Sequence, residues 1–295
     1  MPIRRSGVVV LTAGLVLAAG CAAGTGAPAP AEEAPEVSAE VRGLRVPFDD
    51  YSLSRLDIHT VEHAEDLLTR TCMRGLGLDW ETLPPPAEQD TDPLNRRRYG
   101  LIEPELARRY GYHLPPPAPD QRARAEVWRR REALSPAVRH AAYGADGQGG
   151  CRARARARLA EGLPDIDRQR LNGHIGETFR ASQRDPVVVA VFGRWSACMR
   201  ARGFTYGVPF DASADPAWAR SGRASPREIA VAEADVGCKR QVGLVALWSA
   251  AEQRIQRAAV AAHPEDFRLF LRAREAELRN ARQVIADAAG RATRG

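Results

Sequence analysis

The chain has 295 residues, of which 44% are hydrophobic and 27% are charged, and its formal net charge is +6. This composition is close to the average of globular proteins, which excludes a fully disordered or a fibrous chain. Of the 43 basic residues only Lys239 is a lysine, so the basic character comes almost entirely from arginine. The five cysteines are an odd number and cannot all pair with one another.

Residues 1–20 predict an export signal that is separate from the fold. Two arginines precede an apolar stretch at 8–19, as in the charged and apolar regions of a signal peptide. The stretch is shorter than the roughly 20 residues of a membrane-spanning helix. Small residues precede Cys21 as in a bacterial lipobox, although Ala18 stands where leucine is usual. We therefore expect Cys21 to carry a lipid; the alternative is ordinary secretion, with Cys21 unmodified.

Residues 21–44 are rich in alanine, glycine, proline and glutamate and show no apolar periodicity. Such a segment cannot bury enough apolar surface to fold, which predicts a flexible tether. Two or more acyl chains hold a protein firmly at a bilayer, whereas one does not. A diacylglyceryl group on Cys21 would therefore anchor the chain to the extracytoplasmic face of the cell membrane, and the membrane is the expected partner.

Beyond the tether, the apolar spacing predicts helices. A strongly amphipathic helix is expected from Ser54 to Arg74, and the remaining helices are expected over 104–110, 126–142, 152–158, 165–182, 187–202, 225–262 and 263–289. Proline- and glycine-rich stretches between them predict loops. No stretch alternates as a strand does, so we predict an all-α domain over 45–290. The last two helices are expected to form a long antiparallel hairpin.

The tripeptide Cys-Met-Arg occurs at Cys72 and again at Cys198, each time followed by a glycine and an apolar residue. A Gly-Cys-basic string follows later, at Cys151 and at Cys238. Exported proteins retain disulfides because their compartment is oxidising. The shared order predicts one bridge in each copy, Cys72–Cys151 and Cys198–Cys238. The alternative is a chance repeat with unpaired thiols.

The repeat also predicts the domain organisation. The signal covers 1–20 and the tether 21–44. Two diverged Cys-Met-Arg units are expected over about 45–160 and 161–262, and a C-terminal helix completes the helical domain.

One string has a catalytic character. His59, Glu62 and His63 match the H-x-x-E-H pattern of inverted zinc proteases. On a helix the two imidazoles share a face, so both could reach one metal, and Glu62 could serve as a general base. The sequence offers no third ligand, and the alternative is a pair of packed or solvated histidines. Nucleotide-binding and serine-hydrolase motifs are absent from the sequence. We therefore predict no catalytic residue and no cofactor.

Positive charge is concentrated at 120–158, which holds ten arginines and four acidic residues. At its end Arg152, Arg154, Arg156 and Arg158 alternate with alanine. Because alanine favours helix over strand, these arginines are expected on two helix faces. Such a surface suits anionic lipid headgroups or a cell-wall polymer; nucleic acid is not expected for an exported protein. The alternative is a solvated helix face. No protein partner is indicated.

The arginine-rich composition, the lipobox at Cys21, the tether and the Cys-Met-Arg-x-x-Gly-apolar repeat belong together with two further strings, Arg97-Arg98-Tyr99-Gly100 and Tyr110-Gly111-Tyr112. This combination resembles the uncharacterised exported lipoproteins of Streptomyces and related high-GC actinobacteria, over most of the chain. The resemblance implies a cell-envelope location and no particular activity.

We therefore expect a cell-surface lipoprotein that is a non-catalytic binding or accessory module of the envelope. The alternative function is a surface metal-dependent hydrolase that uses His59, Glu62 and His63.

Overall fold

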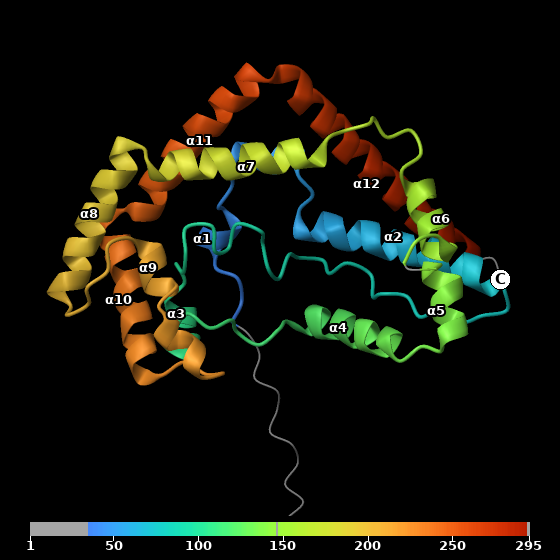
Figure 1. The fold of residues 1–295 in the computed structure, drawn as a ribbon, viewed down its shortest axis with the longest axis horizontal. Helices are drawn as coiled ribbons and strands as arrows, with labels where there is room; N and C mark the ends of the chain where they lie inside the picture. The colour runs from blue at the N-terminus through green and yellow to red at the C-terminus, as the bar shows by residue number, and fades with distance from the viewer. Residues whose placement is uncertain (1–34, 146, 294–295) are drawn as a thin grey trace, which may run out of the picture. The chain divides into compact units, whose positions relative to one another are not determined.

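The computed structural model describes residues 35–145 and 147–293. The predicted signal, Cys21 and most of the predicted tether lie outside these residues. Within them the chain is helical; the sole β feature of the described part is a single bridge between Ala145 and Gln148. The prediction of an all-α domain is confirmed (Figure 1). In the described part, no helix has both the length and the apolar character needed to cross a membrane.

The helices can be followed in chain order in Figure 1. They are α1 (Ala39–Arg42), the 3₁₀ helix η1 (Pro47–Tyr51), α2 (Arg55–Arg74), α3 (Pro104–Tyr110), α4 (Pro119–Glu132), α5 (Pro136–Tyr143), α6 (Gly150–Leu159), α7 (Arg168–Gln183), α8 (Pro186–Ala201), α9 (Pro209–Ser213), the 3₁₀ helix η2 (Pro216–Arg220), α10 (Pro226–Val242), α11 (Leu244–Ala262) and α12 (Pro264–Ala292).

Helices begin where a polar side chain can accept a hydrogen bond from a free backbone N–H. Ser54 caps α2, Asp185 caps α8 and Ser225 caps α10 in this way. The predicted bounds of α2 and α3 agree with the structure. Helix α4 begins at Pro119, earlier than predicted, because proline at the first helical position sets the backbone for a helix start.

The folded domain begins before the predicted boundary at residue 45. Ser38 caps the short helix α1, and Val37 and Val41 are buried against Ile102. The end of the predicted tether is therefore part of the domain. The two valines are four residues apart and pack in one cluster with Ile102. Two apolar residues within an alanine- and proline-rich segment are too short a pattern to predict a helix from the sequence.

The single helix predicted over 225–262 is wrong, because α10 ends at Val242 and α11 begins at Leu244. Gly243 lies between them with φ +66°, in the left-handed region. Glycine adopts this conformation without the steric penalty of a side chain and commonly ends a helix. The chain therefore turns within what looks, from its apolar spacing, like one continuous helix.

The C-terminal helices α11 and α12 are joined by one residue, His263, as in a hairpin. The antiparallel packing that we expected along their length does not occur. Helix α12 packs mainly on α2, whereas α11 packs mainly on α7 and α8 (Figure 1). Arg274 of α12 donates hydrogen bonds to the Ser52 carbonyl, just before α2, and to Asp57 in the first turn of α2. Helix α12 thus packs mainly against α2, near the start of the described chain, and not along α11.

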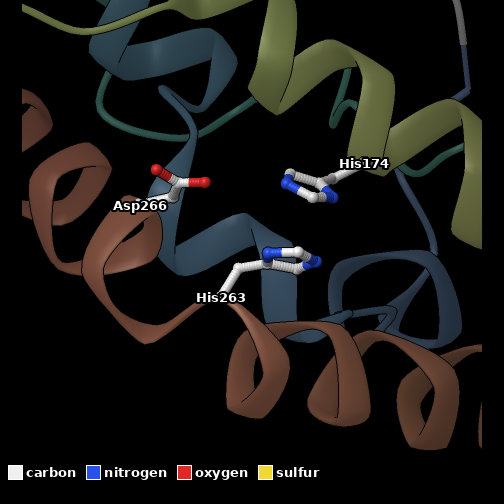
Figure 2. Close-up of side chains that lie close together, drawn as sticks. All are labelled: His174, His263 and Asp266. Atoms are coloured by element: carbon white, nitrogen blue, oxygen red, sulfur yellow. The ribbon is translucent and has the colours of Figure 1, made fainter.

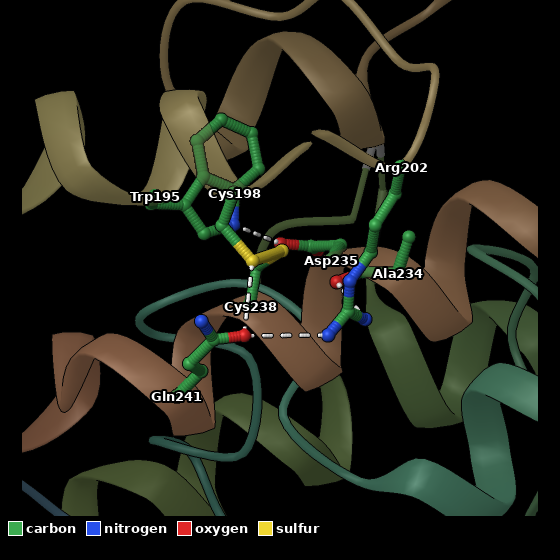
Figure 3. The surroundings of a disulfide bond; sticks show 7 residues. All are labelled: Trp195, Cys198, Arg202, Ala234, Asp235, Cys238 and Gln241. Atoms are coloured by element: carbon green, nitrogen blue, oxygen red, sulfur yellow. Dashed lines mark hydrogen bonds between the residues drawn. A yellow bond between two sulfur atoms is a disulfide. The ribbon is translucent and has the colours of Figure 1, made fainter. Parts of the chain in front are cut away.

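Both predicted disulfides are confirmed. Cys72 at the end of α2 is bonded to Cys151 in the first turn of α6. Cys198 near the end of α8 is bonded to Cys238 in α10 (Figure 3). Each bridge therefore links two helices that pack against each other.

The Cys-Met-Arg repeat is a repeated helix end. In each copy the methionine is buried and its carbonyl accepts a hydrogen bond of 3.0 Å from the amide five residues later, from Leu78 to Met73 and from Phe204 to Met199. The intervening glycine has φ +69° at Gly77 and +84° at Gly203. This is the Schellman geometry, which requires the left-handed conformation at the glycine. The division into two units stays a prediction, since the described residues belong to one compact body.

The only lysine of the chain lies in the core. Lys239 is 2% exposed, and its Nζ donates hydrogen bonds of 2.9 Å to the carboxylate of Asp235 and to the carbonyl of Leu101. The Asp235 carboxylate also accepts from the Trp195 indole at 2.9 Å and from the Tyr112 hydroxyl at 3.2 Å. Burial raises the pKa of Asp235 despite the favourable effect of Lys239. The ion pair thus has its hydrogen bonds satisfied inside the protein.

A second buried carboxylate, that of Glu228, accepts hydrogen bonds of 2.8 Å from the Tyr112 amide and from Nδ1 of His113. Nε2 of His113 lies 2.9 Å from the carbonyl of Ser221. Both ring nitrogens therefore face acceptors, which favours the doubly protonated ring. The Ser221 carbonyl and then Glu228 raise the pKa of His113.

Candidate functional site

A cavity of about 560 Å³ lies beside the first folded residues of the chain. It is formed by α1, η1, the start of α2, the loop at 89–95 and one side chain of α12, and its lining residues are Val41, Arg42, Leu44, Arg45, Asp49, Ser52, Leu53, Ser54, Asp57, Gln89, Asp90, Pro93, Leu94, Asn95 and Arg274. Its volume is within the range of small-molecule sites.

One part of the cavity wall is apolar. Leu44 and Leu53 are half-buried, and Leu94 has 50% of its surface exposed although it is a large hydrophobic residue. Pro93 continues this surface. When a ligand covers apolar side chains that are in contact with water, the removal of their surface from water favours binding by about 25 cal/mol per Å². This part of the wall can therefore receive the apolar part of a ligand.

Two of the lining carboxylates are held by the protein itself. Asp57 accepts hydrogen bonds from the Ser54 amide at 3.0 Å and from Arg274 at 2.9 Å. Burial raises the pKa of Asp57, but these partners outweigh that effect and the net shift is downward. Asp49 accepts from Asn95 and from a backbone amide, both at 2.9 Å. These groups shape the cavity, and Asp57 stays ionised, which does not suit a general acid.

Arg42 is the lining cation that forms no ion pair with any described residue. Its Nε donates to the carbonyl of Val37 at 3.2 Å, while its two terminal nitrogens have no acceptor among the described residues. Arg45, by contrast, is paired with Asp50 at 3.2 Å. A guanidinium with two free N–H groups on one edge can bind a carboxylate, phosphate or sulfonate. The cavity thus joins an apolar wall to one available cation.

Two residues of the predicted metal-binding string, His63 and Glu62, make contacts with other parts of the protein. His63 Nδ1 lies 2.8 Å from the carbonyl of Leu83, in the loop that follows α2, and Glu62 is ion-paired with Arg124. His59 is half-buried, and burial lowers the pKa of both histidines. Within 35–145 and 147–293, no third potential ligand gathers with them. The pairing with Arg124 also occupies the carboxylate that would have served as base.

The arginines of α6 lie on two faces, as their spacing predicts. Arg152 and Arg156 share the carboxylate of Glu65, at 2.6 and 3.2 Å. Arg158 is paired with Glu161 at 2.5 Å, and Arg154 donates to the sulfur of Cys151 at 3.6 Å. Three of these four arginines are therefore ion-paired within the protein, but with only two carboxylates, those of Glu65 and Glu161. The surface that remains for anionic lipid or polymer is less positive than the sequence indicates.

Three further residues form a group that the sequence analysis missed. His174 on α7, His263 between α11 and α12, and Asp266 in the first turn of α12 place their potential ligand atoms within 4.8 Å of one another (Figure 2). His174 and Asp266 are half-buried and His263 is exposed. The two segments are distant in the chain. The one local sign was the string His263-Pro264-Glu265-Asp266, which we interpreted as a helix start.

Comparison of the chain with protein-family models, with curated proteins and with solved structures gave no match. We therefore infer the function from the residues and their geometry.

Proposed function

We propose that the protein is a lipid-anchored module of the cell envelope that binds a small amphipathic anion in the cavity beside α1. The observation that carries this proposal is the cavity itself, whose lining includes Leu44, Leu53 and Leu94 together with Arg42. The predicted lipid on Cys21 and the two disulfides are consistent with an exported domain.

The chemistry of the lining favours binding over catalysis. Asp57 and Asp49 are engaged by hydrogen bonds within the protein, and the described lining contains no histidine or cysteine that could act as base or nucleophile. A ligand with an apolar body and one anionic group would cover the leucines and pair with Arg42. We therefore expect saturable binding without turnover.

Fluorescence titration with 1-anilinonaphthalene-8-sulfonate tests this proposal, because that probe joins aromatic rings to one sulfonate. The mature domain should give saturable enhancement with one site. Arg42→Ser removes a charge-assisted hydrogen bond of about 1.5–3 kcal/mol, so its Kd should rise about tenfold or more. Arg194→Ser, at an exposed arginine of α8, is the matched control and should bind as the wild type does. Equal affinities of the two variants would refute the site.

The anchor is tested separately, by labelling growing cells with a fatty-acid probe. The wild-type protein should take up the label, and Cys21→Ala should abolish the uptake. An unlabelled wild-type protein, or labelling that is unchanged in the variant, would show that Cys21 is not the lipidated residue. This outcome would leave the cavity assignment untouched, since the titration uses the domain alone.

A further inference from the structure

We propose that His174, His263 and Asp266 form a Zn²⁺ site with one coordination position open to solvent. The site is independent of the cavity beside α1 and of the predicted string at His59. His174 comes from the middle of α7, and the other two ligands come from the turn between α11 and α12 and from the first turn of α12 (Figure 2). Two helical segments that are distant in sequence therefore contribute to one ligand set.

The geometry requires little adjustment to hold a metal. The three ligand atoms lie within 4.8 Å of one another. Zn–N bonds of about 2.0–2.1 Å in a tetrahedron place the ligand atoms about 3.3 Å apart. The atoms must therefore approach one another by up to about 1.5 Å, and the exposed His263 ring is the ligand with the most freedom to move. The two imidazole centroids are 4.9 Å apart, and their planes meet at 42°. The rings are therefore close without stacking face to face.

A second observation points to a ligand at this place. Nε2 of His174 is buried and has no hydrogen-bond partner. Buried polar atoms are nearly always satisfied, and an exception calls for an explanation, such as an ion. The ring of Phe267 lies 5.3 Å from the His174 ring and covers one of its sides. A metal bound to His174 would give this nitrogen the partner that the protein itself does not provide.

The ligand types select the metal. Two imidazole nitrogens and one carboxylate oxygen suit zinc, whereas calcium and magnesium prefer sites built from oxygen alone. Three protein ligands leave a fourth position for water, as in zinc sites that are open to substrate. Because His263 is exposed, we place this fourth position on the side of its ring, where water can enter.

Arg170 influences the carboxylate from outside. Its Nη1 donates to both oxygens of Asp266, at 3.0 and 3.2 Å. A hydrogen bond of this kind orients a ligating carboxylate, but the guanidinium also competes with a cation for the same oxygens. The Arg170 side chain is largely exposed, so it can move aside. We therefore expect removal of Arg170 to strengthen zinc binding.

Zinc at this site would connect α7 to the turn between α11 and α12. Helix α11 packs on α7 and α8, and α12 packs on α2, so the turn at His263 joins two differently packed helices. A metal bound across it would restrain the turn. Since a ligand that binds only the folded state stabilises it, saturating zinc should raise the melting temperature.

Isothermal titration of the EDTA-treated mature domain, with both disulfides intact and with ZnCl₂ as the probe, tests this assignment. We expect one zinc per chain, with binding weakened at least a hundredfold in His263→Ala and in Asp266→Asn, and strengthened in Arg170→Gln. His140→Ala removes an exposed histidine of α5 and should bind normally. His263 makes no side-chain capping bond, so its variant should keep the wild-type circular dichroism.

The same titration of His63→Ala separates this site from the predicted string. Zinc binding that survives in His263→Ala, or that disappears in His63→Ala, would overturn the proposal, as would a wild-type domain that binds no zinc. Co²⁺ gives a second readout, because its visible absorption reports tetrahedral coordination. The absorption should appear in the wild type and in His140→Ala and be lost in His263→Ala.

Discussion

Replacing Lys239 by methionine is the sharpest test of how the core is held together. Methionine keeps most of the side-chain volume but removes the ammonium group that faces Asp235 and the Leu101 carbonyl, each at 2.9 Å. The carboxylate would keep two neutral donors, from Trp195 and Tyr112. The variant therefore isolates the effect of an uncompensated buried charge.

The expected loss in the free energy of unfolding is about 3–5 kcal/mol at neutral pH, the range for a buried ion pair that loses one partner. We expect a loss in the upper part of this range, because Lys239 is 2% exposed and Asp235 is fully buried. A lost hydrogen bond to the Leu101 carbonyl adds to the cost. Arg240→Met, one residue further along α10, is the control. Its pair with Glu40 is exposed, so its loss should be below about 1 kcal/mol.

Urea unfolding followed by circular dichroism, with the disulfides intact, measures both losses. The sign of the pH dependence follows from Asp235, whose pKa is raised in the folded protein by burial. A group with a raised folded-state pKa takes up a proton on folding, so stability increases as the pH falls towards that pKa. Lys239 lowers this pKa in the wild type, so its removal raises the pKa of Asp235 further. The variant therefore gains more stability than the wild type as the pH falls, and the deficit of Lys239→Met should be smaller at pH 5 than at pH 7.5.

A double variant completes the test. Adding Asp235→Asn to Lys239→Met removes both charges while keeping an acceptor for Trp195 and Tyr112, so it should recover part of the lost stability. The reasoning fails if Lys239→Met is no worse than Arg240→Met, or if its deficit grows as the pH falls.

Three further predictions concern other features of the fold. Replacing both Cys198 and Cys238 by serine should lower the free energy of unfolding by about 4 kcal/mol through loop entropy, measured by urea unfolding, and a loss near zero would contradict this. Gly243→Ala should destabilise by about 1–2 kcal/mol because its φ is +66°. Gly193→Ala, in the middle of α8 with open space around it, should instead stabilise by up to about 1 kcal/mol; equal melting temperatures would refute the assigned helix break. His113→Gln should lower the melting temperature most below pH 6.5, the ordinary pKa of histidine. The difference should vanish as the pH rises through the raised folded-state pKa, because the protonated ring makes the contacts; a difference that grows with pH would contradict it.

Features that depend on neighbouring residues could be predicted from the sequence. The helix from Ser54 to Arg74 has its cap, its apolar spacing and its terminating glycine within one segment. The Cys-Met-Arg string occurs twice and is followed each time by a Gly-Cys-basic string, and this shared order predicted the two bridges. The position of Gly243 within an apolar pattern did not predict a break, since glycine is compatible with both a helix and a turn.

The candidate sites could not be predicted in the same way. The cavity lining combines residues of α1, a loop and α12, and no spacing rule connects them. His174 lies on α7 and His263 lies between α11 and α12, so their proximity follows from the packing of α11 on α7. The string at His59 satisfied a spacing rule, but Arg124, distant in sequence, pairs with its glutamate.

The sequence by itself determined the helical class and the ends of α2, because these depend on backbone conformation and on side chains a few residues apart. It also predicted the cysteine pairing, through the repeated order of the Cys-Met-Arg and Gly-Cys-basic strings. Only the tertiary structure decided which helices pack together and which charges lie in the core. Lys239 shows the difference. Its rarity is visible in the composition, but its burial depends on Asp235 and on the Leu101 carbonyl. A charge is stable in the interior only when all of its partners are brought to it at once, and that is a property of the packed chain.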